Sequence, residues 1–361
     1  MLIEQLAITT TPKYSFPQPT INTSLPQRLT ELSIHSLKHA QNQPFQLNQQ
    51  FFQQNSPEQI QTTRTQLQPI PLKPKLEKTM VTAVDTSTIK IGETTKGIVI
   101  AVRGATIWKN RTHYRYMRFG PFIFHVTEEN KKQVYNALKR TYLNSPHEHN
   151  HNHNGSPSLL QMPTRIASIL ERWQQTMLSK TVTNGLILFD GSLTSGINDT
   201  PTQRIKEILD NARKKQNVVL AFSKMTTLRF NGYLITDIPV NHKPPYLFKI
   251  TGLKPKPPIV LLGDVYVAKL TKGNYAFRLD IDKQVPTEQK IEALEKLLGN
   301  DLLSQSYPET LRLAHILCTF TANEVIAMQH FITRKYNLKI INRPDMHRLL
   351  FGPFGKGETC S

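Results

Sequence analysis

The chain has 361 residues, with 45 lysines and arginines against 26 aspartates and glutamates, which gives a formal net charge of +19. This charge favours a polyanionic partner such as nucleic acid, because bound phosphates release counterions, although an acidic protein or a membrane surface would also fit. Two cysteines cannot form a disulfide framework, and no run reaches the ~18 consecutive apolar residues of a membrane span. A secreted disulfide scaffold and a membrane protein are therefore excluded, and we expect a cytoplasmic protein.

Residues 1–75 differ in composition from the rest of the chain. Glutamine and asparagine dominate residues 41–63, and three prolines follow. Such a segment buries too little apolar area to offset the entropy lost on ordering. Apolar residues recur at helical spacing only over 29–39, which predicts a short helix there. We expect a mostly irregular N-terminal arm that is dispensable for folding.

The next segment predicts a three-stranded meander. A β-branched run covers 80–85, and two further strands are expected over 97–108 and 113–126. Their short connections favour antiparallel pairing. Thr127 is expected to begin a helix with two glutamates in its first turn. Residues 145–157 then form a low-complexity loop rich in histidine and asparagine.

Beyond this loop, helical and strand patterns alternate. Helices are predicted over 163–180, 202–216, 287–298, 308–319 and 322–336, and strands over 185–191, 218–224, 246–251, 259–270 and 275–281. Thr321 and Glu324 form a capping box for the last helix. Residues 79–340 are therefore predicted to form an α/β domain, a mixed sheet flanked by helices, followed by a tail over 341–361.

Two carboxylates end apolar strands. Asp85 follows MVTAV and Asp190 follows GLILF. Ligands of α/β sheets usually sit at strand ends, where a carboxylate is costly to bury without compensation. Taken singly, each aspartate is as well explained by ordinary turn chemistry. Equivalent positions on two strands that could be neighbours favour a shared site.

Two further candidates lie on helices. Glu171 is close to the apolar stripe of its helix, and His315 lies on an apolar face with Leu311 and Cys318. The alternatives are a solvated glutamate paired with Arg165 or Arg172, and a hydrogen-bonded core histidine. Two aspartates, a glutamate and a histidine together would suit Mg²⁺ or Mn²⁺. Two such ions can clamp the attacking and leaving oxygens of a phosphodiester.

The stretch from Trp108 to Phe119 interleaves basic and aromatic residues, which is the composition that single-stranded nucleic acid requires. The candidates are Lys109, Arg111, Tyr114, Arg115, Tyr116 and Arg118. The alternative is an edge strand that carries arginine against aggregation.

Two other groups rank below the first set as metal ligands. Asp280 and Asp282 alternate on one strand face, where Arg278 could pair with both. The loop histidines could bind Zn²⁺ loosely, but nothing beside them would fix the ligands, and a solvated loop explains them better; they are His147, His149, His151 and His153.

The order of several motifs resembles the NurA family of nucleases, over about residues 79–335. The motifs are VDTS at Asp85, the helical Glu171, LFDGSL at Asp190, FSK at Lys224, VYVAKL at Tyr266 with FRLDI, and YPETLRLAH at His315. The first motif departs from the expected form, with DTS in place of DGS. The N-terminal arm and the histidine-rich loop are additions to the pattern, and neither removes a candidate ligand.

The resemblance implies a ribonuclease H-like fold and a DNA nuclease that uses Mn²⁺ or Mg²⁺, with two ions expected. It implies that Asp85, Glu171, Asp190 and His315 are metal-centred catalytic residues, with Tyr266 as a further catalytic residue and Lys224 as a phosphate contact. It also implies exonuclease action on DNA ends, endonuclease action on single strands, and a homodimer docked on a HerA-type hexameric translocase in recombinational repair. Two alternatives remain: a non-catalytic nucleic-acid-binding scaffold, and another ribonuclease H-like enzyme such as a resolvase or transposase.

Overall fold

A computed structural model describes residues 3–8, 24–41, 61–62, 68–143, 157–196, 201–230, 233–238 and 242–341. The glutamine- and asparagine-rich segment lies almost entirely outside the described residues. The four histidines of the predicted loop and the tail beyond Ile341 also lie outside them. Among the described helices, none combines the length and the apolar character needed to cross a bilayer.

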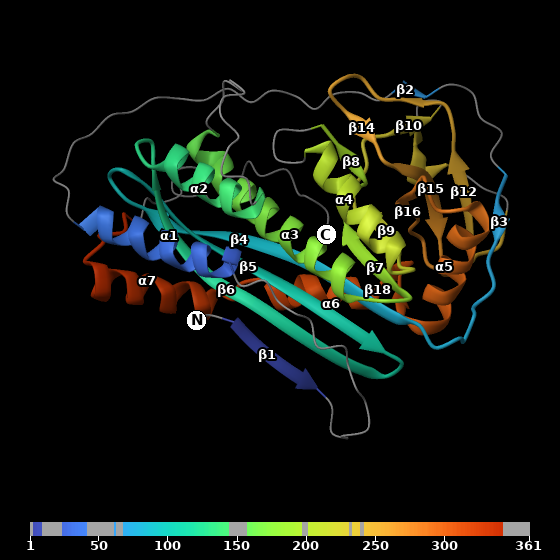
Figure 1. Cartoon of the computed structure of the whole chain (residues 1–361), viewed down its shortest axis with the longest axis horizontal. Coiled ribbons are helices and arrows are strands. Elements are labelled where there is room, and N and C mark those ends of the chain that lie inside the picture. Colours follow the sequence, from blue (N-terminus) through green and yellow to red (C-terminus); the bar gives the residue numbers. More distant parts are fainter. Residues whose placement is uncertain are drawn as a thin grey trace, which may run out of the picture.

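A ten-stranded mixed sheet forms the centre of the molecule (Figure 1). Its strands, in spatial order, are β1 (Ile3–Ile8), β6 (His113–Thr127), β5 (Gly97–Asn110), β4 (Met80–Glu93), β7 (Gly185–Asp190), β9 (Val218–Ser223), β16 (Phe277–Asp282), β15 (Gly263–Lys269), β12 (Tyr246–Ile250) and β3 (Ile70–Pro71). Strands β4, β5 and β6 are antiparallel, whereas β7 runs parallel to β4, and β9 parallel to β7. The predicted mixed sheet is confirmed, and the order β6-β5-β4-β7-β9 is the ribonuclease H-like arrangement.

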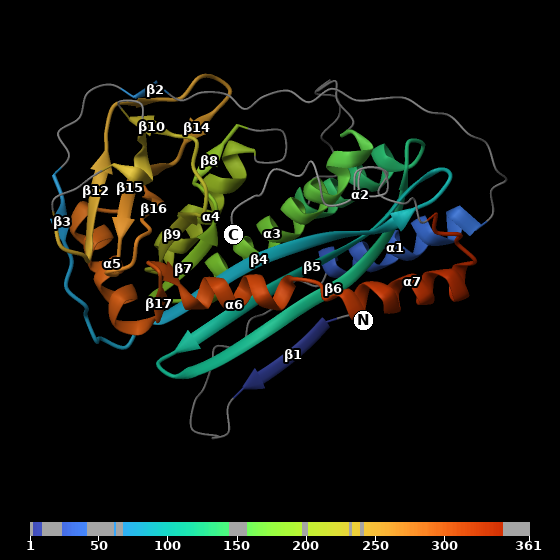
Figure 2. The ribbon, with the colours of Figure 1, turned by 180° about the vertical axis from the view of Figure 1, so that it is seen from behind.

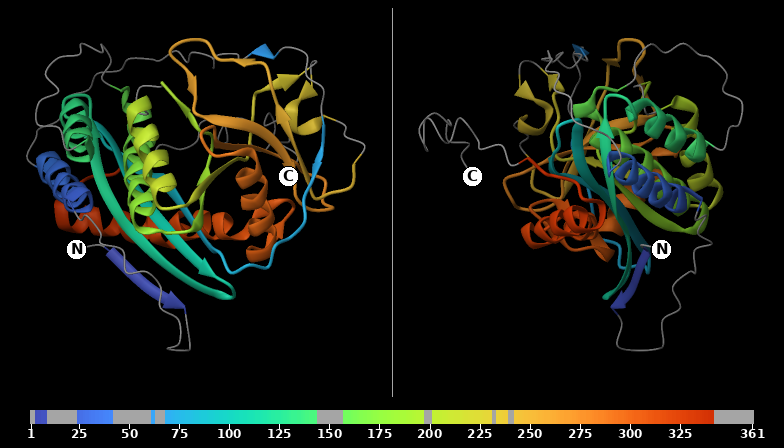
Figure 3. Two further views of the ribbon diagram at one scale, coloured as in Figure 1. Left: turned by 45° about the vertical axis from the view of Figure 1, so that its right-hand side comes forward. Right: turned by 90° about the vertical axis from the view of Figure 1, so that its left-hand side faces the viewer.

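Helices cover both faces of this sheet. One face carries α1 (Ser24–Gln41), α2 (Lys131–Leu143), α3 (Met162–Thr181) and α4 (Thr202–Lys214), and the other carries α5 (Thr287–Asn300), α6 (Glu309–Cys318) and α7 (Ala322–Tyr336). Figure 2 shows α6 and α7 in front of the long strands, and the right-hand view of Figure 3 shows those strands between the two groups of helices. Alternate strand residues supply the two cores: Val84 and Phe189 face α3, whereas Ala83 and Leu188 face α6.

Short elements complete the described chain. They are η1 (Leu159–Gln161), η2 (Ile235–Asp237) and the paired strands β2 (Gln61–Thr62) with β13 (Leu253–Lys254), β8 (Thr194–Ser195) with β14 (Val260–Leu261), β10 (Arg229–Phe230) with β11 (Tyr233–Leu234), and β17 (Leu303–Ser304) with β18 (Tyr307–Pro308).

Two of the differences between predicted and observed boundaries have a clear structural cause. Strand β4 does not end at Asp85 but continues to Glu93, because β5 pairs with it along the whole length. Helix α2 begins at Lys131 rather than after Thr127, because Thr127 and Asn130 bond each other in a turn: Thr127 N donates to Asn130 Oδ1, and Asn130 N to Thr127 Oγ1. The capping box of Thr321 and Glu324 on α7 is confirmed.

The N-terminal segment contributes to the folded core. Strand β1 pairs antiparallel with β6, so β6 is not the edge strand that the sequence allowed. Helix α1 is longer than predicted, and its Leu25 and Leu29 are fully buried in the same core cluster as α3. Ser36 Oγ also accepts a hydrogen bond from the backbone N of His125. We therefore no longer expect residues 24–41 to be dispensable for folding.

Candidate metal-binding active site

Asp85 and Asp190 are register neighbours on adjacent parallel strands. The pairing of β4 with β7 ends at Val84 opposite Phe189, and the next residue of each strand is an aspartate. Strand β7 ends at Asp190, whereas β4 continues beside β5. The sequence therefore predicted the neighbourhood of the two aspartates, although Asp85 lies within a strand rather than at its end.

His315, on helix α6, bonds the side chain of Asp85. Asp85 Oδ2 lies 2.7 Å from His315 Nδ1, and Asp85 Oδ1 accepts a hydrogen bond of 2.7 Å from Thr86 N. The Asp85 side chain is buried, whereas that of His315 is 52% exposed. The alternative of a buried core histidine is thus wrong, because His315 pairs with a carboxylate at the surface. The two residues are 230 positions apart in the chain.

Glu171 approaches from α3 on the other face of the sheet. Its Oε1 accepts a hydrogen bond from Gln175 Nε2 at 2.9 Å, and Gln175 Oε1 in turn accepts one from Arg172 at 2.7 Å. Burial raises the pKa of Glu171 to about 7; Arg172 opposes this shift, while the charges of Asp85 and Asp190 add to it. Glu171 is therefore within electrostatic reach of both aspartates and is not a solvated surface residue.

The three carboxylates repel one another. The pKa of Asp85 is raised by burial and then by Asp190, and the bonds from His315 and Thr86 and the charge of Lys224 only partly oppose this. A set of three carboxylates and one imidazole supplies the oxygen-rich ligands that Mg²⁺ and Mn²⁺ prefer. Because a divalent cation would remove the repulsion, the residues present fit the metal ions expected from the sequence.

Lys224 follows β9 and contacts Asp190. Its Nζ lies 2.7 Å from Asp190 Oδ2 and 5.7 Å from the ring centroid of Tyr307. The Lys224 side chain is 39% exposed. This lysine thus balances part of the negative charge of the site, and its predicted contact with a phosphate stays a prediction.

Tyr266, which the resemblance indicated, and Tyr307 differ in their surroundings. Tyr266 is buried in β15, where burial and Asp264 raise its pKa to about 12, and Lys249 lies 6.0 Å from its ring centroid. Among its described contacts, none involves the four candidate ligands. In contrast, the pKa of Tyr307 is raised by burial and by Asp190 and Asp85. Tyr307 is the first residue of the YPETLRLAH motif, and this motif is the sequence feature that could have identified it.

The basic and aromatic stretch forms the end of β5 and the first half of β6. Of its six candidates, only Arg111, at the turn between the two strands, is exposed. Tyr114 and Tyr116 are partly buried against the core beneath α6, and Arg115 is buried. Arg118 pairs with Glu324 at 3.4 Å. This stretch therefore offers less to nucleic acid than its composition suggests.

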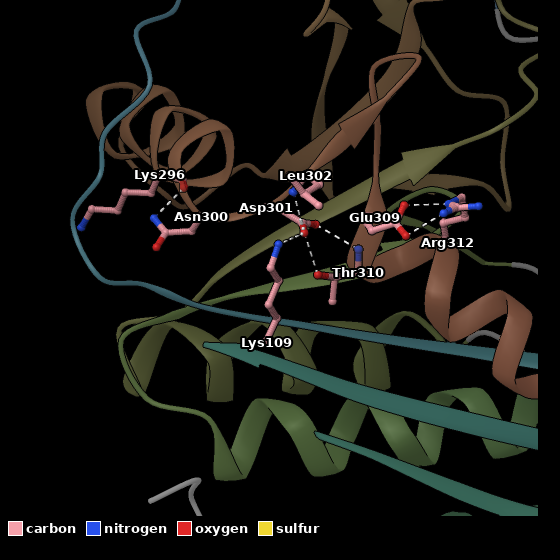
Figure 4. Close-up of polar contacts among 8 residues, drawn as sticks. All are labelled: Lys109, Lys296, Asn300, Asp301, Leu302, Glu309, Thr310 and Arg312. Atoms are coloured by element: carbon pink, nitrogen blue, oxygen red, sulfur yellow. Dashed lines mark hydrogen bonds and ion pairs between the residues drawn. The ribbon is translucent and has the colours of Figure 1, made fainter. Parts of the chain in front are cut away.

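Lys109 is the largest departure from the sequence expectation for this stretch (Figure 4). Its Nζ lies 2.8 Å from Asp301 Oδ1, and both side chains are almost completely buried, with 5% and 0% exposure. Asp301 also accepts hydrogen bonds from Leu302 N, Thr310 N and Thr310 Oγ1. Lys109 thus joins β5 to the start of α6 and is not available to bind phosphate.

The two lower-ranked aspartates are already paired. Arg278 donates to both carboxylate oxygens of Asp280 at 2.7 Å, and Asp280 Oδ2 also accepts from Leu193 N at 3.0 Å. Asp282 pairs with Arg213 rather than with Arg278. These residues hold the turn after β7 and the end of β16, so they do not compete as metal ligands.

Glu171 supplies a test of this electrostatic description. Its folded-state pKa of about 7 exceeds the ordinary value of 4.5, so the folded protein holds this proton more tightly than the unfolded chain. The destabilisation is absent below the ordinary value, grows as the pH rises, and is complete above pH 7. Glu171→Gln removes it, and the metal-free variant should be more stable than the wild type above pH 7 by up to roughly 3 kcal/mol.

Thermal melts in EDTA on either side of this pH range measure the difference. Glu207→Gln is the matched control, because Glu207 lies on α4 with a side chain 43% exposed and pairs with Arg204. A gain for Glu171→Gln that is equally large at low pH would contradict the shifted pKa.

Comparison with known proteins adds little at the level of sequence. No family model matches the chain, and no curated protein matches it. Two solved structures are distantly similar. The C-terminal lobe of a budding yeast Argonaute has 12% identity and a TM-score of 0.28, and the match covers 73% of this chain and 51% of that one.

The second is Kluyveromyces polysporus Argonaute with a guide RNA, with 12% identity and a TM-score of 0.25, over 66% of this chain and 26% of that one. This chain thus spans about half the length of the first structure and a quarter of the second. We base no conclusion about function on likenesses this distant.

Proposed function

We propose that this protein is a metal-dependent DNA nuclease that hydrolyses phosphodiesters. The observation that carries the proposal is the bond between His315 and Asp85, together with the electrostatic influence that Asp85 and Asp190 exert on Glu171 and Asp190 exerts on Asp85. Carboxylates that repel one another lower stability, and a functional site is a common reason for such an arrangement. The net charge of +19 supports a polyanionic substrate.

Asp85, Glu171, Asp190 and His315 would hold the metal, which we take to be Mn²⁺ or Mg²⁺ in two copies. Bound there, the ions would supply electrostatic stabilisation of the charge that develops on the scissile phosphate. The residues of the site have the remaining roles. Asp85 fixes the His315 ring through Nδ1, which leaves Nε2 as the nitrogen that would face the metal. Glu171, whose pKa is raised by burial and by the two aspartates, would give up its proton on taking up the metal.

The finer parts of the proposal rest on the motif resemblance. They are exonuclease action on DNA ends, endonuclease action on single strands, and partnership of a homodimer with a HerA-type hexameric translocase in the repair of double-strand breaks. The exposed cations Arg111 and Lys224 are proposed to contact DNA phosphates. Tyr266 is proposed to act only through the packing of β15, because its contacts lie away from the four ligands.

The test is cleavage of end-labelled single- and double-stranded DNA by the full chain with Mn²⁺, with Mg²⁺ and with EDTA. We expect shortening of the labelled strand with at least one metal, no shortening in EDTA, and loss of the activity in Asp85→Ala. Binding without cleavage under every condition, also with the translocase added, would favour the scaffold alternative. Selective cutting of branched junctions would favour a resolvase.

A further inference from the structure

A thiol lies within the candidate active site. Cys318 is one turn after His315 on α6, and its Sγ, a nitrogen of His315 and an oxygen of Asp85 all lie within 4.8 Å of one another. Cys318 is fully buried, and its thiol donates to the backbone oxygen of His315 at 3.2 Å. The chemistry proposed above needs oxygen and imidazole ligands and gives no role to sulfur.

We propose that Asp85, His315 and Cys318 form a binding site for a thiophilic divalent cation, with Zn²⁺ as the physiological occupant, and that this cation inhibits the nuclease. The inhibitory role rests on the proposed function, whereas the binding site does not. Imidazole, thiolate and carboxylate are the ligands that zinc takes in proteins, and three of them leave a fourth position open.

The sulfur decides which cation is favoured. Mg²⁺ and Mn²⁺ prefer oxygen ligands and bind sulfur weakly, so the Cys318 thiol would keep its proton beside them. Zn²⁺ binds sulfur strongly enough to displace that proton: the S–H bond breaks, an S–Zn bond forms, and the proton leaves to solvent. The same position with serine would lose this preference.

Inhibition follows from shared ligands. Asp85 and His315 belong both to this cluster and to the proposed set for Mn²⁺ or Mg²⁺. A cation held by Cys318 withdraws these two residues from the other arrangement, so the two occupancies exclude each other. Zinc should therefore inhibit at concentrations far below those of the activating ion.

Cobalt absorption tests the site directly, because Co²⁺ is a spectroscopic substitute for zinc and a thiolate ligand gives a charge-transfer band that imidazole does not. The full chain and Cys360→Ser should both show this band on addition of Co²⁺, and Cys318→Ser should not. Cobalt held by the histidine-rich loop alone gives no such band. A wild-type protein without the band, or a band that survives in Cys318→Ser, would overturn the proposal.

His315→Ala is the second variant, since its half-exposed side chain can be removed even if the buried Cys318 cannot be replaced without unfolding. It should weaken Co²⁺ binding, measured by titration of the band, by at least about tenfold, and unchanged binding would overturn the site.

Inhibition of cleavage by Zn²⁺ tests the regulatory role. It should need about tenfold more zinc in Cys318→Ser than in Cys360→Ser, and equal inhibition would refute this role. A Cys318-dependent band in a protein that never cleaves DNA would confirm the site and refute the nuclease.

Discussion

Asp190→Asn is expected to lower the rate of DNA cleavage by roughly a thousandfold or more while leaving the fold intact. Asparagine has the same shape but no charge, so one of the three carboxylates that would hold the metal is lost. Losing one preorganised electrostatic group at a reacting centre typically costs a factor of about 10²–10³, and a shared metal ligand should cost at least this. Single-turnover cleavage with saturating enzyme measures the chemical step.

DNA binding separates this explanation from unfolding. Without the charge of Asp190, Lys224 loses its partner and becomes free to contact phosphate, so DNA affinity should stay equal or increase. Asp237→Asn, at an exposed position in η2, is the matched control and should change neither quantity. Cleavage by Asp190→Asn at close to the wild-type rate would show that the assignment of the site is wrong.

Lys109→Met is expected to reduce the free energy of unfolding by about 3–5 kcal/mol, the usual cost of removing one partner from a buried ion pair. The loss comes mainly from Asp301, whose buried carboxylate keeps its hydrogen bonds from Leu302 and Thr310 but loses its only described positive partner. Denaturation with urea, followed by circular dichroism, measures the change.

A second substitution shows whether the buried charge is the cause. Lys109→Met combined with Asp301→Asn should recover part of the loss, because the amide is neutral and retains an acceptor for Thr310. Arg312→Ala is the control from the same region: it breaks the pair with Glu309 in Figure 4, but the arginine side chain is 53% exposed, and we expect no comparable loss. Equal effects of Lys109→Met and Arg312→Ala would contradict the importance of burial.

The sequence predicted those elements that are specified locally. The apolar run of β7, the periodic stripe of α3 and the capping box of α7 depend on neighbours a few residues away, and the structure has them close to their expected bounds. The length of β4 and the pairing of β1 with β6 depend instead on strands far away in the chain. No local pattern specifies such pairings, so these features could not be predicted.

The distinction between local and distant contacts also explains which parts of the candidate site could be predicted. Asp85 and Asp190 could be placed together because both follow apolar strands expected to be neighbours. The sequence indicated Lys109 as a phosphate contact. Its partner Asp301 is 192 residues away, in a loop before α6, so no local pattern reveals the ion pair. Tyr307 could be identified from the sequence only as part of the YPETLRLAH motif. Cys318 looked like a member of an apolar face, and only the approach of β4 to α6 shows that its sulfur lies beside Asp85.

The long chain separation between Asp85 and His315 also bears on when the site can form during synthesis. Their contact joins a strand from the first third of the chain to a helix near its end. A ribosome must therefore have synthesised the chain past His315 before these two side chains can meet. Chains that terminate before α6 would have the carboxylates of the sheet without the histidine, and under the proposed function they would lack a complete active site.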